Sequence, residues 1–348
     1  MSDTVPFQLP PRFTIHTFAS NLGNPRDMVF SPGGTLLVSS PKTGEILALP
    51  DTQNTATATN KEIVLKNLNH PHGLAFYKKN LFVATTTQVI RYDWNEKKFK
   101  ATNAKVLFSL PANNDHNNPT IIVDAKGTLY VSVGSTCNVC YEVSPQSGTV
   151  LISNANGDTP RIFAKGLRNA PFLAINPLTK QLWATEMGRD YLGDTLPPDE
   201  IDILQQGRNY GWPLCYGNKI HDTQFNPSKT DPCKNTTAPI YEIPAHSAPL
   251  GLVFITSSQF PKAWQNDVLV AYHGSWNRSV PDGYKMVHLK VSGNTITKAE
   301  DFLTGFLPKN ALSGKDATSR PVDLIFDKAG TLYISDDKGG NVFIMQKR

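Results

Sequence analysis

One short phrase recurs six times along the chain. Each copy opens at a Pro, continues through mostly apolar residues and a turn, and ends in a run of β-branched and aromatic residues that closes on small polar ones. The opening prolines are Pro25, Pro71, Pro119, Pro171, Pro249 and Pro321. Such a phrase is typical of a β-hairpin, because β-branched residues favour strands and Pro is tolerated where a strand begins.

The spacing of the phrase indicates which all-β fold the hairpins build. The first four prolines lie about 50 residues apart, which is the length of one four-stranded propeller blade. The repeat therefore predicts an all-β, six-bladed β-propeller of four-stranded blades, with further strands at Glu45–Leu49, Val89–Tyr92, Val150–Ser153 and Met286–Val291. A β-sandwich is the alternative, but its strand signals would not recur in phase over most of the chain.

The last two intervals between prolines are longer than the others by roughly thirty residues. We therefore expect one propeller domain over residues 1–348, with long loop insertions around residues 190–245 and 255–318.

Composition excludes several other classes of protein. The chain is 39% hydrophobic and 18% charged, which is unlike disordered, collagenous or coiled-coil sequences. The net charge of +5 is spread without a run of like charges, so a nucleic-acid partner is not expected. There is no apolar stretch long enough for a membrane span and no signal-peptide pattern at the start. The chain is thus either cytosolic or numbered after removal of a signal peptide.

The four cysteines favour disulfides. Cys137 and Cys140 form a CxxC motif, and Cys215 and Cys233 bracket a polar loop, so three pairings are possible. No His or second CxxC stands at zinc-finger spacing. Disulfides would point to an oxidising compartment, whereas buried free thiols are the alternative.

Residues next to the opening prolines should meet at one mouth of the propeller channel, because they hold equivalent positions in every blade. They are Asn24, His70, His72, His116, Asn118, Arg168, Asn169, His246 and Arg320. The ends of the second strands add Ser135, Glu186, His273, Thr85–Thr87 and Asp336–Asp337. A ring of Arg, His and Asn suits a flat, oxygen-rich anion, since guanidinium binds carboxylate in a bidentate fork. Taken singly, each residue could instead be a hydrogen-bonded loop residue or a surface ion-pair partner.

Several longer strings extend this pattern. They are Val133–Cys140, Gly166–Asn169, Leu192–Asp199, Gly207–Pro213, Ala245–Leu252, His273–Arg278 and Arg320–Asp323. Through them the chain resembles the soluble glucose/sorbosone dehydrogenases, and in particular the sorbosone-dehydrogenase-like branch. The resemblance covers nearly the whole chain and implies a six-bladed propeller that binds pyrroloquinoline quinone (PQQ) with calcium.

The resemblance also implies roles for individual residues. His116 takes the place of the general base. Arg168 and Asn169 are expected near the quinone and carboxylate oxygens of the cofactor, where Arg168 would also be catalytic by neutralising the charge that develops on the quinone. The other expected cofactor contacts are His246, Arg278 and Arg320. Calcium would be bound by backbone carbonyls at Gly188 and Arg189, where the glucose-oxidising branch carries Gly-Pro.

The function implied is oxidation of an aldose, sorbosone or related sugar by hydride transfer to PQQ. Cys140 is followed by Tyr141, so no CxxCH haem site is present and a separate soluble electron acceptor is expected. The family implies a periplasmic or secreted protein. Two alternatives stay open: a calcium-dependent, lactonase-like propeller hydrolase, and a propeller binding module without catalysis.

Overall fold

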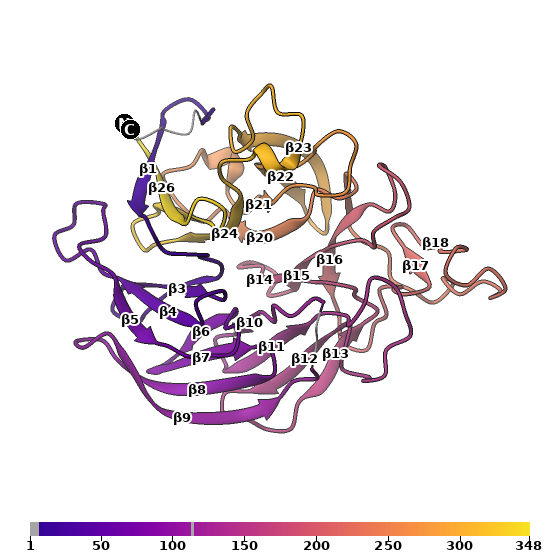
Figure 1. The fold of residues 1–348 in the computed structure, drawn as a ribbon, viewed down its shortest axis with the longest axis horizontal. Helices are drawn as coiled ribbons and strands as arrows, with labels where there is room; N and C mark the ends of the chain where they lie inside the picture. Colours follow the sequence, from indigo (N-terminus) through magenta and orange to yellow (C-terminus); the bar gives the residue numbers. More distant parts are fainter. Residues whose placement is uncertain (1–6, 113–114) are drawn as a thin grey trace.

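The computed structural model describes residues 7–112 and 115–348, whose strands form six four-stranded antiparallel sheets that follow one another in chain order (Figure 1). The first sheet contains β2 (Met28–Phe30), β3 (Leu36–Ser40), β4 (Glu45–Leu49) and β5 (Glu62–Leu65). The second contains β6 (Leu74–Tyr77), β7 (Asn80–Thr85), β8 (Gln88–Asn95) and β9 (Lys100–Ser109). The third contains β10 (Ile121–Val123), β11 (Thr128–Val133), β12 (Thr149–Asn154) and β13 (Arg161–Lys165).

The remaining sheets follow the same order from the axis outward. The fourth contains β14 (Phe172–Ile175), β15 (Leu182–Glu186), β16 (Asp199–Leu204) and β19 (Tyr241–Ile243). The fifth contains β20 (Pro249–Phe254), β21 (Val268–Tyr272), β22 (Lys285–Ser292) and β23 (Thr295–Leu303). The sixth contains β24 (Pro321–Phe326), β25 (Leu332–Asp336), β26 (Asn341–Lys347) and β1 (Phe13–Ala19). The predicted six-bladed propeller is confirmed, and the four additional predicted strands coincide with β4, β8, β12 and β22.

The first strand of each sheet contacts the first strand of the next, and β24 returns to β2. Side chains at the strand starts link the sheets around this axis. Asp27 Oδ2 accepts a hydrogen bond from the Leu74 N–H, and Asp323 Oδ2 accepts one from the Met28 N–H, both at 2.8 Å. Because these residues come from neighbouring sheets, the bonds hold the blades together where they converge.

The N-terminal strand closes the ring. β1 pairs antiparallel with β26, with Phe13 opposite Lys347 and Ile15 opposite Met345. The outermost strand of the last blade therefore comes from the other end of the chain, which leaves no blade incomplete.

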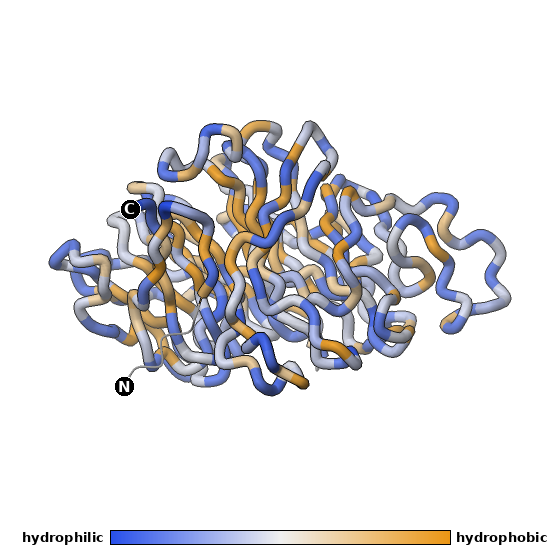
Figure 2. The backbone as a smooth tube through the Cα atoms, turned by 90° about the horizontal axis from the view of Figure 1, so that it is seen from above, coloured by the Kyte–Doolittle hydropathy of each residue, from blue (hydrophilic) through white to orange (hydrophobic). Residues whose placement is uncertain are grey.

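The core is divided into layers between neighbouring blades. In β3, Leu36 and Val38 pack in a cluster shared with the sixth blade, whereas Leu37 packs in a cluster shared with the second. Alternate residues of a strand point to opposite faces, and here both faces are covered. This is why β3 is buried along its whole length and reads as a continuous run of apolar and small residues. In Figure 2 the apolar positions accordingly concentrate in the strands and the polar ones along the outer loops.

The fourth blade carries a long excursion between β16 and β19. It includes the short hairpin of β17 (Cys215–Tyr216) and β18 (Ile220–His221), which projects from the ring of blades (Figure 1). Disulfides join Cys215 to Cys233 and Cys137 to Cys140, and the described residues contain no free cysteine. The predicted disulfides are thus confirmed. Over the same residues, no helix has the length and apolar character needed to cross a membrane.

Candidate functional site

The loops that precede several first strands surround a cavity of about 190 Å³. Its lining includes these predicted site residues: His116, Arg168, Asn169, Gly188 and His246. It also includes Met187, Asp190, Asp199, Ala248, Trp276 and Asn277, which the repeat pattern did not select. Arg189, Arg278 and Arg320, also predicted, are not among the lining residues.

Arg168 is the cation of this cavity, and its direction is fixed by the protein. Nε donates to the backbone oxygen of Asn138 at 2.9 Å, and Nη2 donates to Asn138 Oδ1 at 3.0 Å and Asp190 Oδ2 at 2.8 Å. Nη1 donates to the carbonyls of Gly188 at 3.0 Å and Met187 at 3.5 Å. All five guanidinium N–H groups therefore have protein acceptors. A ligand in the cavity would interact with the positive charge of Arg168 but would not find a guanidinium N–H without a hydrogen-bond acceptor.

His116 is held as a neutral imidazole of defined tautomer. Nδ1 lies 3.1 Å from the Ser135 carbonyl oxygen and 2.9 Å from Ser135 Oγ, which itself donates to the Cys137 carbonyl at 2.7 Å. A carbonyl only accepts, so Nδ1 carries the proton and Nε2 carries the lone pair. Burial, together with the positive charge of Arg168, lowers the pKa of His116 to about 3.

Asp199, at the start of β16, joins the loops of two blades beneath the cavity. Its carboxylate accepts from the Gly188 N–H at 2.9 Å and from the Ala248 N–H at 2.8 Å. Burial raises the pKa of Asp199 to about 7, although both N–H groups favour the ionised form. Asp199 thus sets the backbone of two cavity-lining residues.

His246 and Arg278 organise the opposite wall. His246 Nε2 donates to the Gly193 carbonyl at 2.8 Å, and Arg278 Nη1 donates to the Ala245 carbonyl at 3.0 Å. Arg278 therefore supports the residue before His246 and pairs with Asp282 at 3.2 Å. The Arg278 guanidinium therefore affects the cavity by holding the backbone of Ala245, which precedes His246.

Asn277 and Trp276 also line the cavity. Asn277 Nδ2 donates to Asp190 Oδ1 at 2.8 Å, while Asn277 Oδ1 is buried without a hydrogen-bond partner. An unpaired buried acceptor is costly, so a ligand donor would stabilise it. Trp276 is 66% exposed and meets Tyr191 edge to face with centroids 6.0 Å apart.

Arg320 belongs to a second polar group next to the cavity. Its guanidinium approaches His273 Nδ1 at 3.4 Å, and His273 Nε2 pairs with Asp337 at 2.9 Å. Asp337 also pairs with Arg26 at 2.8 Å. Burial alone would raise the pKa of Asp337, but His273 and Arg26 hold it well below its usual value. His273 adjoins the cavity, because its N–H donates to the Ala248 carbonyl at 3.0 Å.

Two other residues from the predicted ring are buried supports. Glu186 accepts from the backbone N–H groups of Arg168 at 2.6 Å and Asn169 at 3.2 Å. Burial and the charge of Glu200 raise the pKa of Glu186 well above its usual value. His72 packs edge-on against Phe172, and burial lowers its pKa well below the usual range.

A larger cavity of about 430 Å³ lies in the channel lined by the six first strands. The ionisable groups of its lining are the carboxyls of Asp27 and Asp323, and burial raises the pKa of both. The described residues that line this channel include no Arg, Lys or His, whereas the smaller cavity is lined by Arg168, so the smaller cavity is the better anion site.

Backbone carbonyls are the natural candidates for a calcium site. Carbonyl oxygens at Gly188 and Arg189 are hard ligands of the kind that Ca²⁺ prefers, and the carboxylate of Asp190 lies next in the chain. The Gly188 carbonyl and Asp190 already accept hydrogen bonds from Arg168, so a calcium ion bound to them would share these oxygens with the guanidinium. The side chain of Arg189 turns toward the projecting insert, with Nε 2.8 Å from Asp222 Oδ2. Only the backbone carbonyl of Arg189 would therefore be available to calcium.

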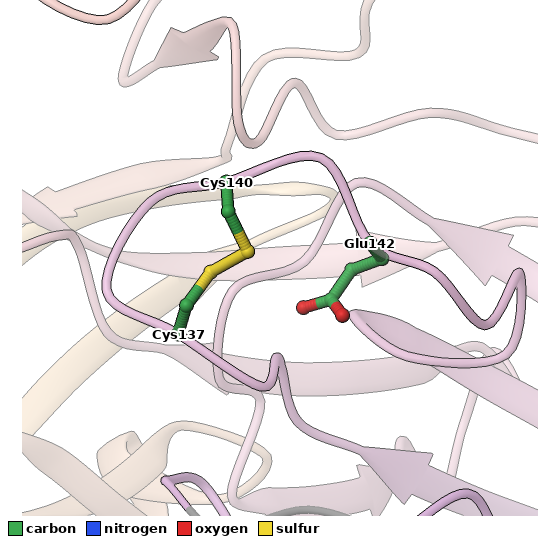
Figure 3. A group of neighbouring side chains, drawn as sticks. All are labelled: Cys137, Cys140 and Glu142. Atoms are coloured by element: carbon green, nitrogen blue, oxygen red, sulfur yellow. A yellow bond between two sulfur atoms is a disulfide. The ribbon is translucent and has the colours of Figure 1, made fainter.

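Side chains alone do not form a metal cage here. Within the described residues, the only group of three His, Cys, Asp or Glu whose ligand atoms lie within 4.8 Å of one another is Cys137, Cys140 and Glu142 (Figure 3). Cys137 and Cys140 are joined in a disulfide, so their sulfurs are not thiolate ligands.

The repeat pattern missed Asn138, Asp199, Asn277 and Asp190. The string Val133–Cys140 contains Asn138, but nothing in its spacing predicts contact with a residue 30 positions away. Asp199 and Asn277 also lie within strings of the resemblance, which was the available signal for them.

Comparison with known proteins shows the family to which this chain belongs. A model of the TrAA12-like family matches residues 7–348. The chain belongs to the TrAA12-like family. An uncharacterized protein of Borreliella burgdorferi is 30% identical over 98% of this chain and 90% of its own length.

Two other proteins to which the chain is similar carry functional names. A pyrroloquinoline quinone-dependent sugar dehydrogenase of Hypocrea jecorina is 25% identical over 94% of this chain and 86% of its own. The calcium structure of the Trichoderma reesei Family AA12 carbohydrate-active enzyme has a TM-score of 0.83 at 23% identity, covering 98% of this chain and 97% of that one. The first comparison confirms the resemblance to soluble PQQ-dependent sugar dehydrogenases, the second shows the shared fold, and the sorbosone-like branch stays a prediction.

Proposed function

We propose that this TrAA12-like protein is a PQQ- and calcium-dependent sugar dehydrogenase. The observation that carries the proposal is the pairing of the Arg168 charge with the neutral His116 imidazole around one cavity, in a chain whose relatives include a PQQ-dependent sugar dehydrogenase. When bound, PQQ with Ca²⁺ supplies the two-electron acceptor for sugar oxidation.

The residues around the cavity fit a planar quinone that bears carboxylates. Arg168 contributes a guanidinium on one side, and Arg320 and Arg26 contribute two more from the neighbouring polar group. Asp190 and Asp337 offset part of the charge of Arg168 and Arg26. Asn277 Oδ1 is a buried acceptor that a bound donor would satisfy. The carbonyls of Gly188 and Arg189 would contribute hard oxygen ligands to calcium, with the remaining ligands coming from bound molecules.

His116 is the proposed general base. Ser135 fixes the proton on Nδ1, so Nε2 is the atom that accepts the hydroxyl proton of the sugar. A base works best with a pKa near the operating pH, whereas burial and, to a lesser extent, the charge of Arg168 hold the pKa of His116 at about 3. An anion bound beside Arg168 would offset this charge, and we infer that the pKa of His116 rises when the cofactor binds.

Exposed aromatic residues beside the cavity support a sugar as the substrate. Trp276 and Tyr191 expose aromatic faces there, which suits the apolar face of a sugar ring. We extend the proposal to an aldose, sorbosone or related sugar, to a separate soluble electron acceptor, and to a periplasmic or secreted location, which the two disulfides support.

The test begins with purified protein stripped of divalent ions. PQQ binding is followed by absorbance titration with and without Ca²⁺, and reduction of an artificial dye is then measured with a panel of aldoses and sorbosone. We expect micromolar or tighter binding and sugar-dependent dye reduction that EDTA abolishes. Absence of PQQ binding at micromolar concentration would refute the proposal, and lactone hydrolysis with calcium alone would favour the hydrolase.

A further inference from the structure

One loop contacts both the cation and the base of the candidate site. It is the four-residue segment 137–140 between β11 and β12, closed by the Cys137–Cys140 disulfide (Figure 3). The Cys137 carbonyl accepts from Ser135 Oγ, which in turn contacts His116 Nδ1. The next residue, Asn138, contacts Arg168.

Asn138 uses all of its hydrogen-bonding oxygens on the site. Its Oδ1 accepts from Arg168 Nη2 at 3.0 Å and from the Asp190 N–H at 2.8 Å. Its backbone oxygen accepts from Arg168 Nε at 2.9 Å and from Trp212 Nε1 at 3.3 Å. Its Nδ2 donates to the Asp190 carbonyl at 3.3 Å.

These contacts define the plane of the guanidinium. Two acceptors from Asn138 engage Nε and Nη2, which lie on one edge of the Arg168 fork, while Asp190 and Gly188 engage single nitrogens. Two parallel bonds to one residue fix orientation as well as distance. Asn138 also holds Asp190, so it sets both the cation and its counter-ion.

The loop that presents Asn138 is itself anchored. The disulfide closes it, and Glu142 on its far side accepts from the N–H and the hydroxyl of Thr136, both at 2.7 Å. Asn138 is therefore displayed from a fixed support.

We propose that Asn138 is a positioning residue for sugar oxidation, which holds the Arg168 guanidinium against the cavity from the disulfide-closed loop. The role of Asn138 in catalysis rests on the proposed function. The positioning itself can be measured without any cofactor, because His116 reports the position of the Arg168 charge.

The experiment uses the full chain without PQQ. The titration of His116 is followed by NMR with ¹³C-labelled histidine and assigned with His116→Gln. The ionisable groups that face or adjoin His116 are Arg168, Asp190, Asp199, His246 and Asp115. Asn138→Ala should raise the titration midpoint of His116 by about one pH unit or more, since a nearby charge moves away. Asn138→Ser should give a smaller rise, and Val139→Ala, the matched control in the same loop, should give none.

A double-mutant cycle separates positioning from general loosening of the cavity. Arg168→Gln removes the charge, so Asn138→Ala should move the His116 midpoint much less in that background, where only the contacts of Asn138 with Asp190 are lost. An equal shift with and without Arg168, or no shift in Asn138→Ala, would overturn the proposal. Loss of the fold in both Asn138 variants, measured by near-UV circular dichroism, would also overturn it, since Asn138 would then serve the fold.

Turnover is the second measurement. With PQQ, Ca²⁺ and sugar, Asn138→Ala should lower kcat by up to about 100-fold with KM little changed, as expected for a misplaced catalytic charge. If the wild-type protein gives no PQQ-dependent turnover, the proposed function fails while the titration still decides the position of Arg168. Unchanged kcat in Asn138→Ala beside an active wild type would count against the proposal.

Discussion

Removal of each of the two disulfides should change stability and activity to different extents. They are removed one at a time, as the Cys137→Ser/Cys140→Ser and Cys215→Ser/Cys233→Ser variants. Their sequence separations are 3 and 18 residues. The chain-entropy relation then gives losses of about 2 kcal/mol for the short loop and about 3 kcal/mol for the long one.

Removal of the short-loop disulfide should lower activity more than removal of the long-loop disulfide. The short loop carries Asn138, whose oxygens hold Arg168, and Cys137, whose carbonyl accepts from Ser135. The long loop lies in the projecting insert and, within the described residues, makes no hydrogen bond or ion pair with Arg168 or His116. It reaches Arg189 through Asp222 and Gln224, and Tyr141 through Phe225 and Asn226. We therefore expect the short-loop variant to lose the larger share of kcat although it unfolds at the higher denaturant concentration.

The assay combines urea unfolding with PQQ-dependent dye reduction at a temperature where both variants are fully folded. Equal loss of kcat in the two variants, or a larger loss in the long-loop variant, would refute the argument from Asn138. A short-loop variant less stable than the long-loop one would refute the entropy estimate.

Three further changes test other parts of the site. His116→Gln should lower kcat by at least about 100-fold while PQQ affinity stays unchanged in a binding titration, because a general base contributes at least that factor. Arg189→Ala should cost about 3 kcal/mol in urea unfolding, because it leaves buried Asp222 unpaired, yet calcium affinity measured by titration should stay the same, since only the backbone carbonyl would bind the ion. The free energy of unfolding should fall as pH rises from about 4 to about 7, because the pKa of Asp199 in the folded protein is raised to about 7 and the folded protein therefore binds a proton that the unfolded protein releases. The contribution of Asp199 is up to about 4 kcal/mol. It is measured by urea titrations at several pH values and should vanish in Asp199→Asn.

The local part of the fold could be predicted from the order of residues. Hairpins such as β10–β11 and β24–β25 join neighbouring segments, so their strand and turn signals lie side by side in the chain. Repetition of that unit at blade length predicted the propeller, and a shared phase in the unit predicted that His116, Arg168, Asn169 and His246 would meet. The last inference works because the start of every first strand points to the same end of the axis.

The contacts that decide the chemistry depended on the tertiary structure. Arg320 shares the phase of the ring, yet it bonds His273 and Tyr284 beside the cavity rather than lining it. The side chain of Arg189, next to Gly188 in the chain, turns to Asp222 in the insert. Neither choice is visible in a local pattern, because each partner lies on a separate loop whose path depends on blade packing.

The sequence by itself determined the repeat unit, the number of blades and the kind of side chain gathered at their tips, because strand and turn preferences act over a few neighbouring residues. Only the tertiary structure decided that β1 completes the last blade, with Phe13 opposite Lys347, and that Asn138 holds Arg168 from a separate loop. The first pairing joins the two ends of the chain and the second joins loops 30 residues apart, so no local periodicity encodes them.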